Sequence, residues 1–176
     1  MALSTKSFSL KTILLYLSCT LIFSSKINAQ GTWSAVNNLA PNYNGGVMLL
    51  LTDGSVIVKT YYGGIGITPG TTWNKLTPDV TGSYKNGTWS TIAAMLNDRL
   101  YFSSWVLNDG RVFVSGGEYG AGNLAEIYDP VANTWTAAAS SGVNLSDGGS
   151  ENLPDGKIIL ASNTGTTLNN YIGIGT

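Results

Sequence analysis

The chain has 176 residues and no histidine, and its one cysteine, Cys19, lies within the first 29 residues. Imidazole and thiolate groups are the usual protein ligands of zinc and copper. A disulfide needs two cysteines, and only one is present. The composition therefore predicts no metal, no cofactor and no disulfide for this chain.

Charge is also scarce, because charged residues make up 11% of the sequence, with nine basic and ten acidic side chains. Three of the nine bases, Lys6, Lys11 and Lys26, lie in the first 29 residues, which leaves six bases against ten acids in the rest. Binding to a nucleic-acid backbone needs a cationic surface. We therefore expect no nucleic-acid partner.

No apolar run is long enough to cross a bilayer, since the longest, Ile13 to Phe23, has 11 residues and a spanning helix needs about 20. Lys6 and Lys11 precede this run and a small residue, Ala29, follows it. This is the layout of a secretory signal peptide. We predict that residues 1–29 are a signal peptide cleaved after Ala29 and that the protein is secreted; acylation of Cys19, as in a lipoprotein, is the alternative.

The remainder of the chain, residues 30–176, repeats one unit three times. In each copy a tryptophan is followed 21 residues later by the glycine of an Asp-Gly pair: Trp33 and Gly54, Trp89 and Gly110, Trp135 and Gly156. Successive tryptophans are 56 and 46 residues apart, near the roughly 40 to 50 residues of a propeller blade. We place the units at roughly 31–86, 87–132 and 133–176, with the extra residues of the first unit in one loop.

Within each unit the pattern is that of short strands. Apolar runs flank every Asp-Gly pair, which predicts a β-hairpin because glycine adopts the positive φ of a tight turn. In the second unit Gly116 and Gly117 bend the chain, a third strand ends at Tyr128, and residues 134–138 form the fourth. No sustained 3.6-residue period occurs after the leader, so we predict an all-β fold.

Residues 99–135 resemble a kelch repeat of the type found in the central domain of galactose oxidase. The shared landmarks are Gly116, Gly117, Tyr128 and Trp135, and the resemblance extends in weaker form over residues 31–176. It implies a kelch-type β-propeller fragment of about three four-stranded blades, with the tryptophans and Tyr128 buried between blades. Propellers close with about 4 to 8 blades, so we expect either the remaining blades of a longer chain or self-association.

The same resemblance implies a copper-radical oxidase site built from two histidines and two tyrosines, one of them linked to a cysteine. This chain has no histidine and no cysteine after the leader, so we predict that it carries no catalytic residue of that chemistry. A hydrolytic carboxylate pair among Glu118, Asp147 and Glu151 is a further hypothesis. The alternative function is a fragment of a carbohydrate-active or galactose-oxidase-like enzyme whose catalytic residues lie in other blades.

Alignment of the units by their Asp-Gly turns places Tyr101 and Asp147 at equivalent positions just before the innermost strand. Variation at equivalent loop positions is where recognition can be placed without disturbing packing. We predict a polar and aromatic contact surface formed by Arg99, Tyr101, Glu118, Tyr119 and Asp147. The predicted function is a secreted, non-catalytic binding or scaffold module for a glycan or an extracellular protein.

Overall fold

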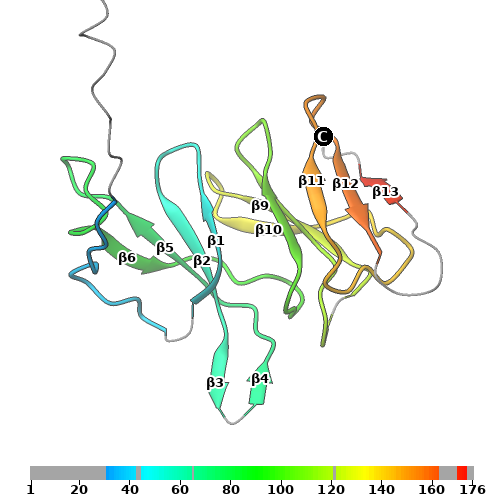
Figure 1. The fold of residues 1–176 in the computed structure, drawn as a ribbon, viewed down its shortest axis with the longest axis horizontal. Coiled ribbons are helices and arrows are strands. Elements are labelled where there is room, and N and C mark those ends of the chain that lie inside the picture. Colours follow the sequence, from blue (N-terminus) through cyan, green and yellow to red (C-terminus); the bar gives the residue numbers. More distant parts are fainter. Residues whose placement is uncertain (1–30, 43–44, 65, 121, 163–169, 174–176) are drawn as a thin grey trace, which may run out of the picture. The chain divides into compact units, whose positions relative to one another are not determined.

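The computed structural model describes residues 31–176 except 43–44, 65, 121, 163–169 and 174–176 (Figure 1). The chain divides into two units, Met1–Ser34 and Ala35–Thr176. The predicted signal peptide, its cleavage after Ala29 and the alternative at Cys19 lie outside the described residues. In the first unit the described residues, 31–34, form no strand.

Every regular element that the structure describes in the second unit is a β-strand, which confirms the all-β prediction. The first sheet has the order β1-β2-β5-β6, with all neighbours antiparallel. Its strands are β1 (Gly45–Leu50), β2 (Val56–Thr60), β5 (Trp73–Thr77) and β6 (Thr88–Thr91). A separate hairpin of β3 (Tyr62–Gly64) and β4 (Gly66–Thr68) lies between β2 and β5 in the chain. It accounts for the extra residues of the first unit.

The second sheet has the order β10-β9-β8-β7 and is also antiparallel. Its strands are β7 (Ser103–Val106), β8 (Val112–Ser115), β9 (Ala125–Asp129) and β10 (Thr134–Ala138). The third sheet has three described strands: β11 (Ser150–Asn152), β12 (Ile158–Ala161) and β13 (Asn170–Gly173). In each sheet the chain adds its strands in sequence order from one edge to the other.

The Asp-Gly pairs form the predicted hairpin turns between the first two strands of each sheet. Gly54, Gly110 and Gly156 have φ values of 82°, 89° and 83°, which glycine adopts without a steric penalty. In Figure 1 these three turns lie at the upper ends of the sheets. The predicted bend after β8 is confirmed as well, because Gly116 and Gly117 have φ values of 76° and 112°.

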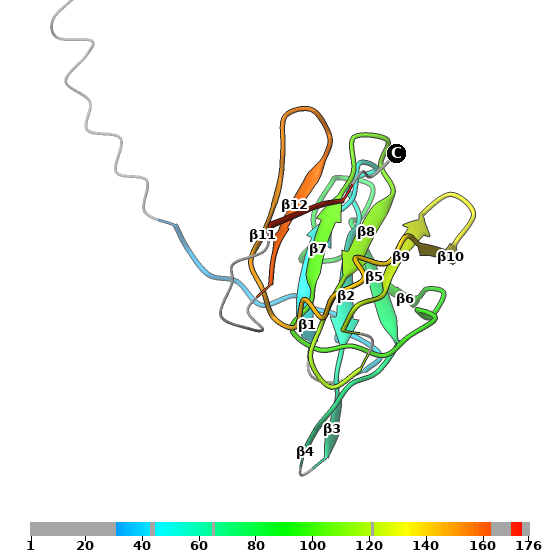
Figure 2. The ribbon, with the colours of Figure 1, turned by 90° about the vertical axis from the view of Figure 1, so that its right-hand side faces the viewer.

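Apolar faces of neighbouring sheets pack against each other (Figure 2). Between the first and second sheets, the ring of Trp73 lies 5.7 Å from that of Trp135, which lies 5.1 Å from that of Tyr128. Between the second and third sheets, Phe113 shares a cluster with Ile158. Because each aromatic side chain contributes about 150 to 250 Å² of buried surface, each sheet is stabilised mainly by its neighbours.

One predicted core residue is placed differently. Trp135 is buried and Trp89 is half-buried, but the side chain of Trp33 is fully exposed. Trp89 and Trp135 lie on β6 and β10, each of which forms the outer edge of a sheet built from the three strands before it. No described strand precedes Trp33. The tryptophan strand thus closes the preceding sheet, and Trp33 has no such sheet in the described part of the chain.

Candidate functional site

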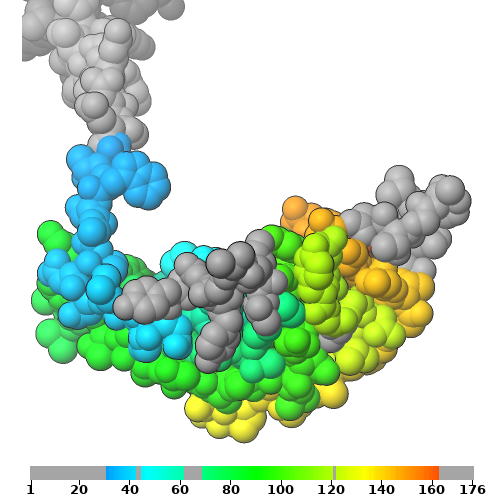
Figure 3. All heavy atoms as spheres, turned by 90° about the horizontal axis from the view of Figure 1, so that it is seen from below, coloured from blue at the N-terminus to red at the C-terminus, as the bar shows by residue number. Residues whose placement is uncertain are grey.

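The loops opposite the Asp-Gly turns meet on one side of the second and third sheets. The residue before β7 and the residue after the glycine doublet pair fully, since Glu118 N donates to Leu100 O at 2.8 Å and Leu100 N to Glu118 O at 3.2 Å. Gly117 N donates to Ser146 O at 2.9 Å, which links the loop before β11. Figure 3 views the molecule from this side. We call Tyr101, Glu118, Tyr119 and Asp147 the loop surface.

A buried ion pair fixes these loops from beneath. Arg99 Nη2 lies 2.6 Å from Glu126 Oε1, and both side chains are wholly buried. Arg99 Nη1 also donates to Gly116 O at 2.8 Å, and the Glu126 carboxylate accepts from Leu96 N at 2.7 Å. Burial lowers the pKa of Arg99, while the hydrogen bond and charge of Glu126 oppose that shift. The pair therefore ties the loop before β7 to the loop after β8 through charge-assisted hydrogen bonds.

This burial corrects one predicted contact residue. Arg99 was expected on the exposed surface, but it has no solvent-accessible side chain and its donors are directed to internal partners. It acts as a positioning residue for the loops. Sequence reasoning missed Glu126, although a carboxylate between the apolar residues Ala125 and Ile127 of β9 is a signal for a buried partner.

The other predicted residues come together on the loop surface. The side chains of Tyr101 and Tyr119 are 45% and 70% exposed. Both have positive φ, 49° and 57°, as does Ser146 at 45°. The left-handed conformation costs a residue with a side chain roughly 1 to 2 kcal/mol, and here the Leu100–Glu118 pairing holds it in place. Such conformations gather at functional sites.

Two carboxylates accompany the rings. Glu118 is half-buried and its Oε1 accepts a hydrogen bond from Ser146 Oγ at 3.4 Å, whereas Asp147 is exposed. Exposed aromatic faces beside carboxylate acceptors offer both apolar contact and hydrogen-bond acceptors to a ligand. This combination suits a neutral molecule that is rich in hydroxyl donors.

A second buried charge lies near the loop surface. Lys59 is wholly buried; its Nζ donates to Thr60 O at 2.7 Å and lies 5.4 Å from the centre of the Tyr61 ring. Burial lowers the pKa of Lys59 to about 8, against the opposing charge of Asp98 and with a smaller contribution from Arg99 in the same direction. Burial and the nearby Tyr101 phenol raise the pKa of Tyr61. Lys59 has no carboxylate within ion-pair distance among the described residues.

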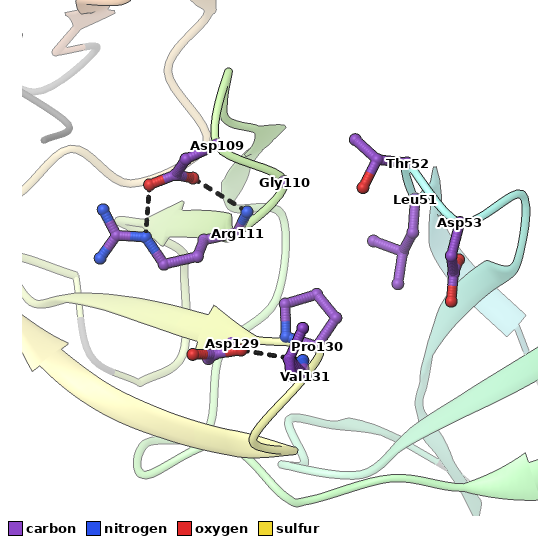
Figure 4. A pocket seen from close by; sticks show the side chains of 9 residues that line it. All are labelled: Leu51, Thr52, Asp53, Asp109, Gly110, Arg111, Asp129, Pro130 and Val131. Atoms are coloured by element: carbon purple, nitrogen blue, oxygen red, sulfur yellow. Dashed lines mark hydrogen bonds and ion pairs between the residues drawn. The ribbon is translucent and has the colours of Figure 1, made fainter.

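A cavity of about 330 Å³ lies on the opposite side, where the Asp-Gly turns of the first two sheets meet the β9–β10 turn (Figure 4). Its three carboxylates serve their own turns. Asp53 accepts from Ser55, Asp109 pairs with Arg111 Nε at 2.6 Å, and Asp129 accepts from the backbone of the turn that follows it. Hydrogen bonds lower the pKa values of Asp53 and Asp109. These acids stabilise the turns, so the loop surface is the better candidate site.

Comparison with known proteins yields a structural relative alone. No family model and no curated protein matches the sequence. Among solved structures, the chain is similar to a novel fungal alcohol oxidase of the AA5 family in complex with copper, with 26% identity and a TM-score of 0.50. The match covers 74% of this chain and 29% of the oxidase chain.

The residues present do not fit the copper of that relative. The sequence has no histidine, and the described residues include no group of three or more His, Cys, Asp or Glu side chains that could hold a metal ion. Among the same residues there is also no helix of the length and apolarity that a bilayer span requires. The sheets and the relative together show an all-β, partial β-propeller-like fold of the galactose-oxidase-like kind.

Proposed function

We propose that this chain is a secreted, non-catalytic binding module of kelch-type blades and that its loop surface binds a glycan. The observation that carries the proposal is the pair of exposed tyrosines, Tyr101 and Tyr119, both held at positive φ. The buried Arg99–Glu126 pair beneath them keeps the loops in one arrangement before any ligand arrives. A preorganised surface binds with a smaller loss of conformational entropy.

The chemistry favours a sugar over a charged ligand. Tyrosine rings provide rigid, amphipathic contact area for the apolar C–H face of a sugar ring, while Glu118 and Asp147 accept hydrogen bonds from its hydroxyl groups. The acidic balance of residues 30–176, six bases against ten acids, disfavours an anionic ligand. Export, supported by the layout of residues 1–29, would bring the surface to glycans outside the cell.

The test is a glycan array probed with the full chain exported from its host, followed by calorimetry on each hit. Replacing Tyr119 with glycine removes the exposed ring and also relieves the positive φ of 57°, so the fold should be kept. We expect affinity to fall at least tenfold. The control Tyr84→Ala removes an exposed tyrosine whose hydroxyl bonds to Gly54 on the turn side and should leave affinity unchanged. An array without hits, or equal loss in both variants, contradicts the proposal.

The second candidate is a fragment of a galactose-oxidase-like enzyme. It is favoured by the likeness to the fungal oxidase, of which the matched region spans 29%. In that case the catalytic residues would lie in blades outside the given sequence. Peroxide formation from primary alcohols by the copper-loaded full chain would support an oxidase; we expect none, because the chain has no imidazole ligand.

A further inference from the structure

The third sheet lacks the outer strand that completes the other two. β6 and β10 each form the fourth strand of a sheet, and each begins with Thr-Trp. β13 pairs with β12 and with no other strand among those described. Residues 31–34, Gly-Thr-Trp-Ser, repeat the sequence of residues 87–90 but belong to no sheet. The molecule thus carries a sheet without its fourth strand and a fourth-strand sequence without its sheet.

The segment that follows Trp33 already occupies its repeat position. Trp135 Nε1 donates to Ala93 O at 2.9 Å, and Trp89 Nε1 donates to Asn38 O at 3.0 Å. Ala93 lies four residues after Trp89, and Asn38 lies five residues after Trp33. Each acceptor therefore belongs to the connector that leads from one tryptophan to the next sheet. Asn38 Nδ2 also donates to Gly87 O at 2.8 Å, which holds this connector on the first sheet.

We propose that residues 31–36 of one copy of this chain add to β13 of a second copy as the fourth strand of its third sheet. A ring of three sheets falls below the roughly 4 to 8 blades with which propellers close, whereas two copies supply six. Reciprocal exchange of the same strand gives a closed two-fold assembly, the commonest symmetry among oligomers. Backbone hydrogen bonds along an open sheet edge are a recurring means of association.

The two complete sheets specify the register of the added strand. Each tryptophan lies opposite a third-strand residue, which itself lies opposite the second-strand residue three positions after the turn aspartate. The pairs of opposed residues are Trp135 with Tyr128, Tyr128 with Val112, Trp89 with Leu76, and Leu76 with Val56. In the third sheet the equivalent second-strand residue is Ile158, which lies opposite Gly173. Trp33 should therefore lie opposite Gly173, and Ser34 opposite Ile172.

Cysteine pairs test both the register and the partner. In full-chain protein with Cys19→Ser, the combination of Ser34→Cys and Ile172→Cys should form a disulfide on oxidation, because directly opposite Cβ atoms are about 4.5 to 5.5 Å apart. We expect a band of twice the chain mass on a non-reducing gel. Ser34→Cys with Tyr171→Cys, one position out of register, should give much less. Cross-linking within a single chain, or equal yields from both pairs, would overturn the proposal.

Light scattering after size exclusion tests the assembly without new cysteines. The full chain should elute as a dimer, and Trp33→Ser should raise its dissociation constant at least tenfold. Because the Trp33 side chain is exposed, this change should leave the circular dichroism and unfolding midpoint of the dissociated chain unaltered. Val131→Ser, at another exposed apolar residue, is the matched control and should stay dimeric. A wild-type chain that remains monomeric at high micromolar concentration refutes the exchange and leaves the glycan proposal untouched.

Discussion

Lys59 gives the sharpest test of the energetics of this fold. Its ammonium is wholly buried and donates to Thr60 O, but it has no ion-pair partner in the described part of the chain. Asp98 attracts it electrostatically and Arg99 repels it, and the net effect of burial lowers its pKa from 10.5 to about 8. An unpaired buried charge destabilises the folded state. We therefore expect Lys59→Met to stabilise the protein at pH 7.

The pH dependence has a defined sign. Below about pH 8 the lysine is charged in both states, and above about 10.5 it is neutral in both. Between these values the unfolded chain binds a proton that the folded chain has released, so the free energy of unfolding increases with pH. At 1.36 kcal/mol per pKa unit, the shift amounts to about 2 to 3 kcal/mol. Burial also raises the pKa values of Tyr61 and Tyr128, which lowers stability above pH 10.

Urea unfolding followed by tryptophan fluorescence at pH 7, 8, 9 and 9.5 measures this effect. The wild type should gain stability across the series, while Lys59→Met should start higher and show a nearly flat profile. Lys85→Met, at an exposed lysine, serves as the control and should reproduce the wild-type slope. A wild-type profile that is flat or falls with pH, or a Lys59→Met protein less stable than the wild type at pH 7, refutes the reasoning.

Three further predictions concern the loops and turns. Glu126→Gln leaves the guanidinium of Arg99 buried without its counter-charge and should lower the free energy of unfolding by about 3 to 5 kcal/mol, as measured by chemical denaturation. Gly117→Ala places a Cβ 2.8 Å from Leu100 O at a φ of 112°; it should destabilise the fold by more than about 1 kcal/mol and accelerate hydrogen exchange at the Leu100 amide. Hydrogen bonds from Thr81 and Ser83 lower the pKa of Asp79 to about 2, so their contribution is present above pH 4 and is lost as pH falls toward 2; Asp79→Asn should reduce the acid dependence of the unfolding midpoint in that range.

Much of the fold follows from local sequence. The Asp-Gly pairs predict hairpin turns because the required backbone conformation is a property of glycine, and all three lie where the repeat places them. The predicted fourth strand at residues 134–138 is β10, and the third strand predicted to end at Tyr128 is β9, which ends at Asp129. Strand period and turn chemistry are short-range properties, so they can be read along the chain.

The site depended on partners that are distant in the chain. Position in the repeat correctly brought Tyr101, Glu118 and Tyr119 into neighbouring loops, but it could not show that Arg99 points inward to a carboxylate 27 residues further on. Lys59 reads as one polar residue of an alternating strand until the neighbouring sheet covers it. Trp33 has the same flanking residues as Trp89 yet is exposed, because burial depends on the three strands beside a tryptophan strand. The sequence by itself determined the turns, strands and repeat; the packing of one sheet on the next decided which side chains are buried, charged and available to a partner.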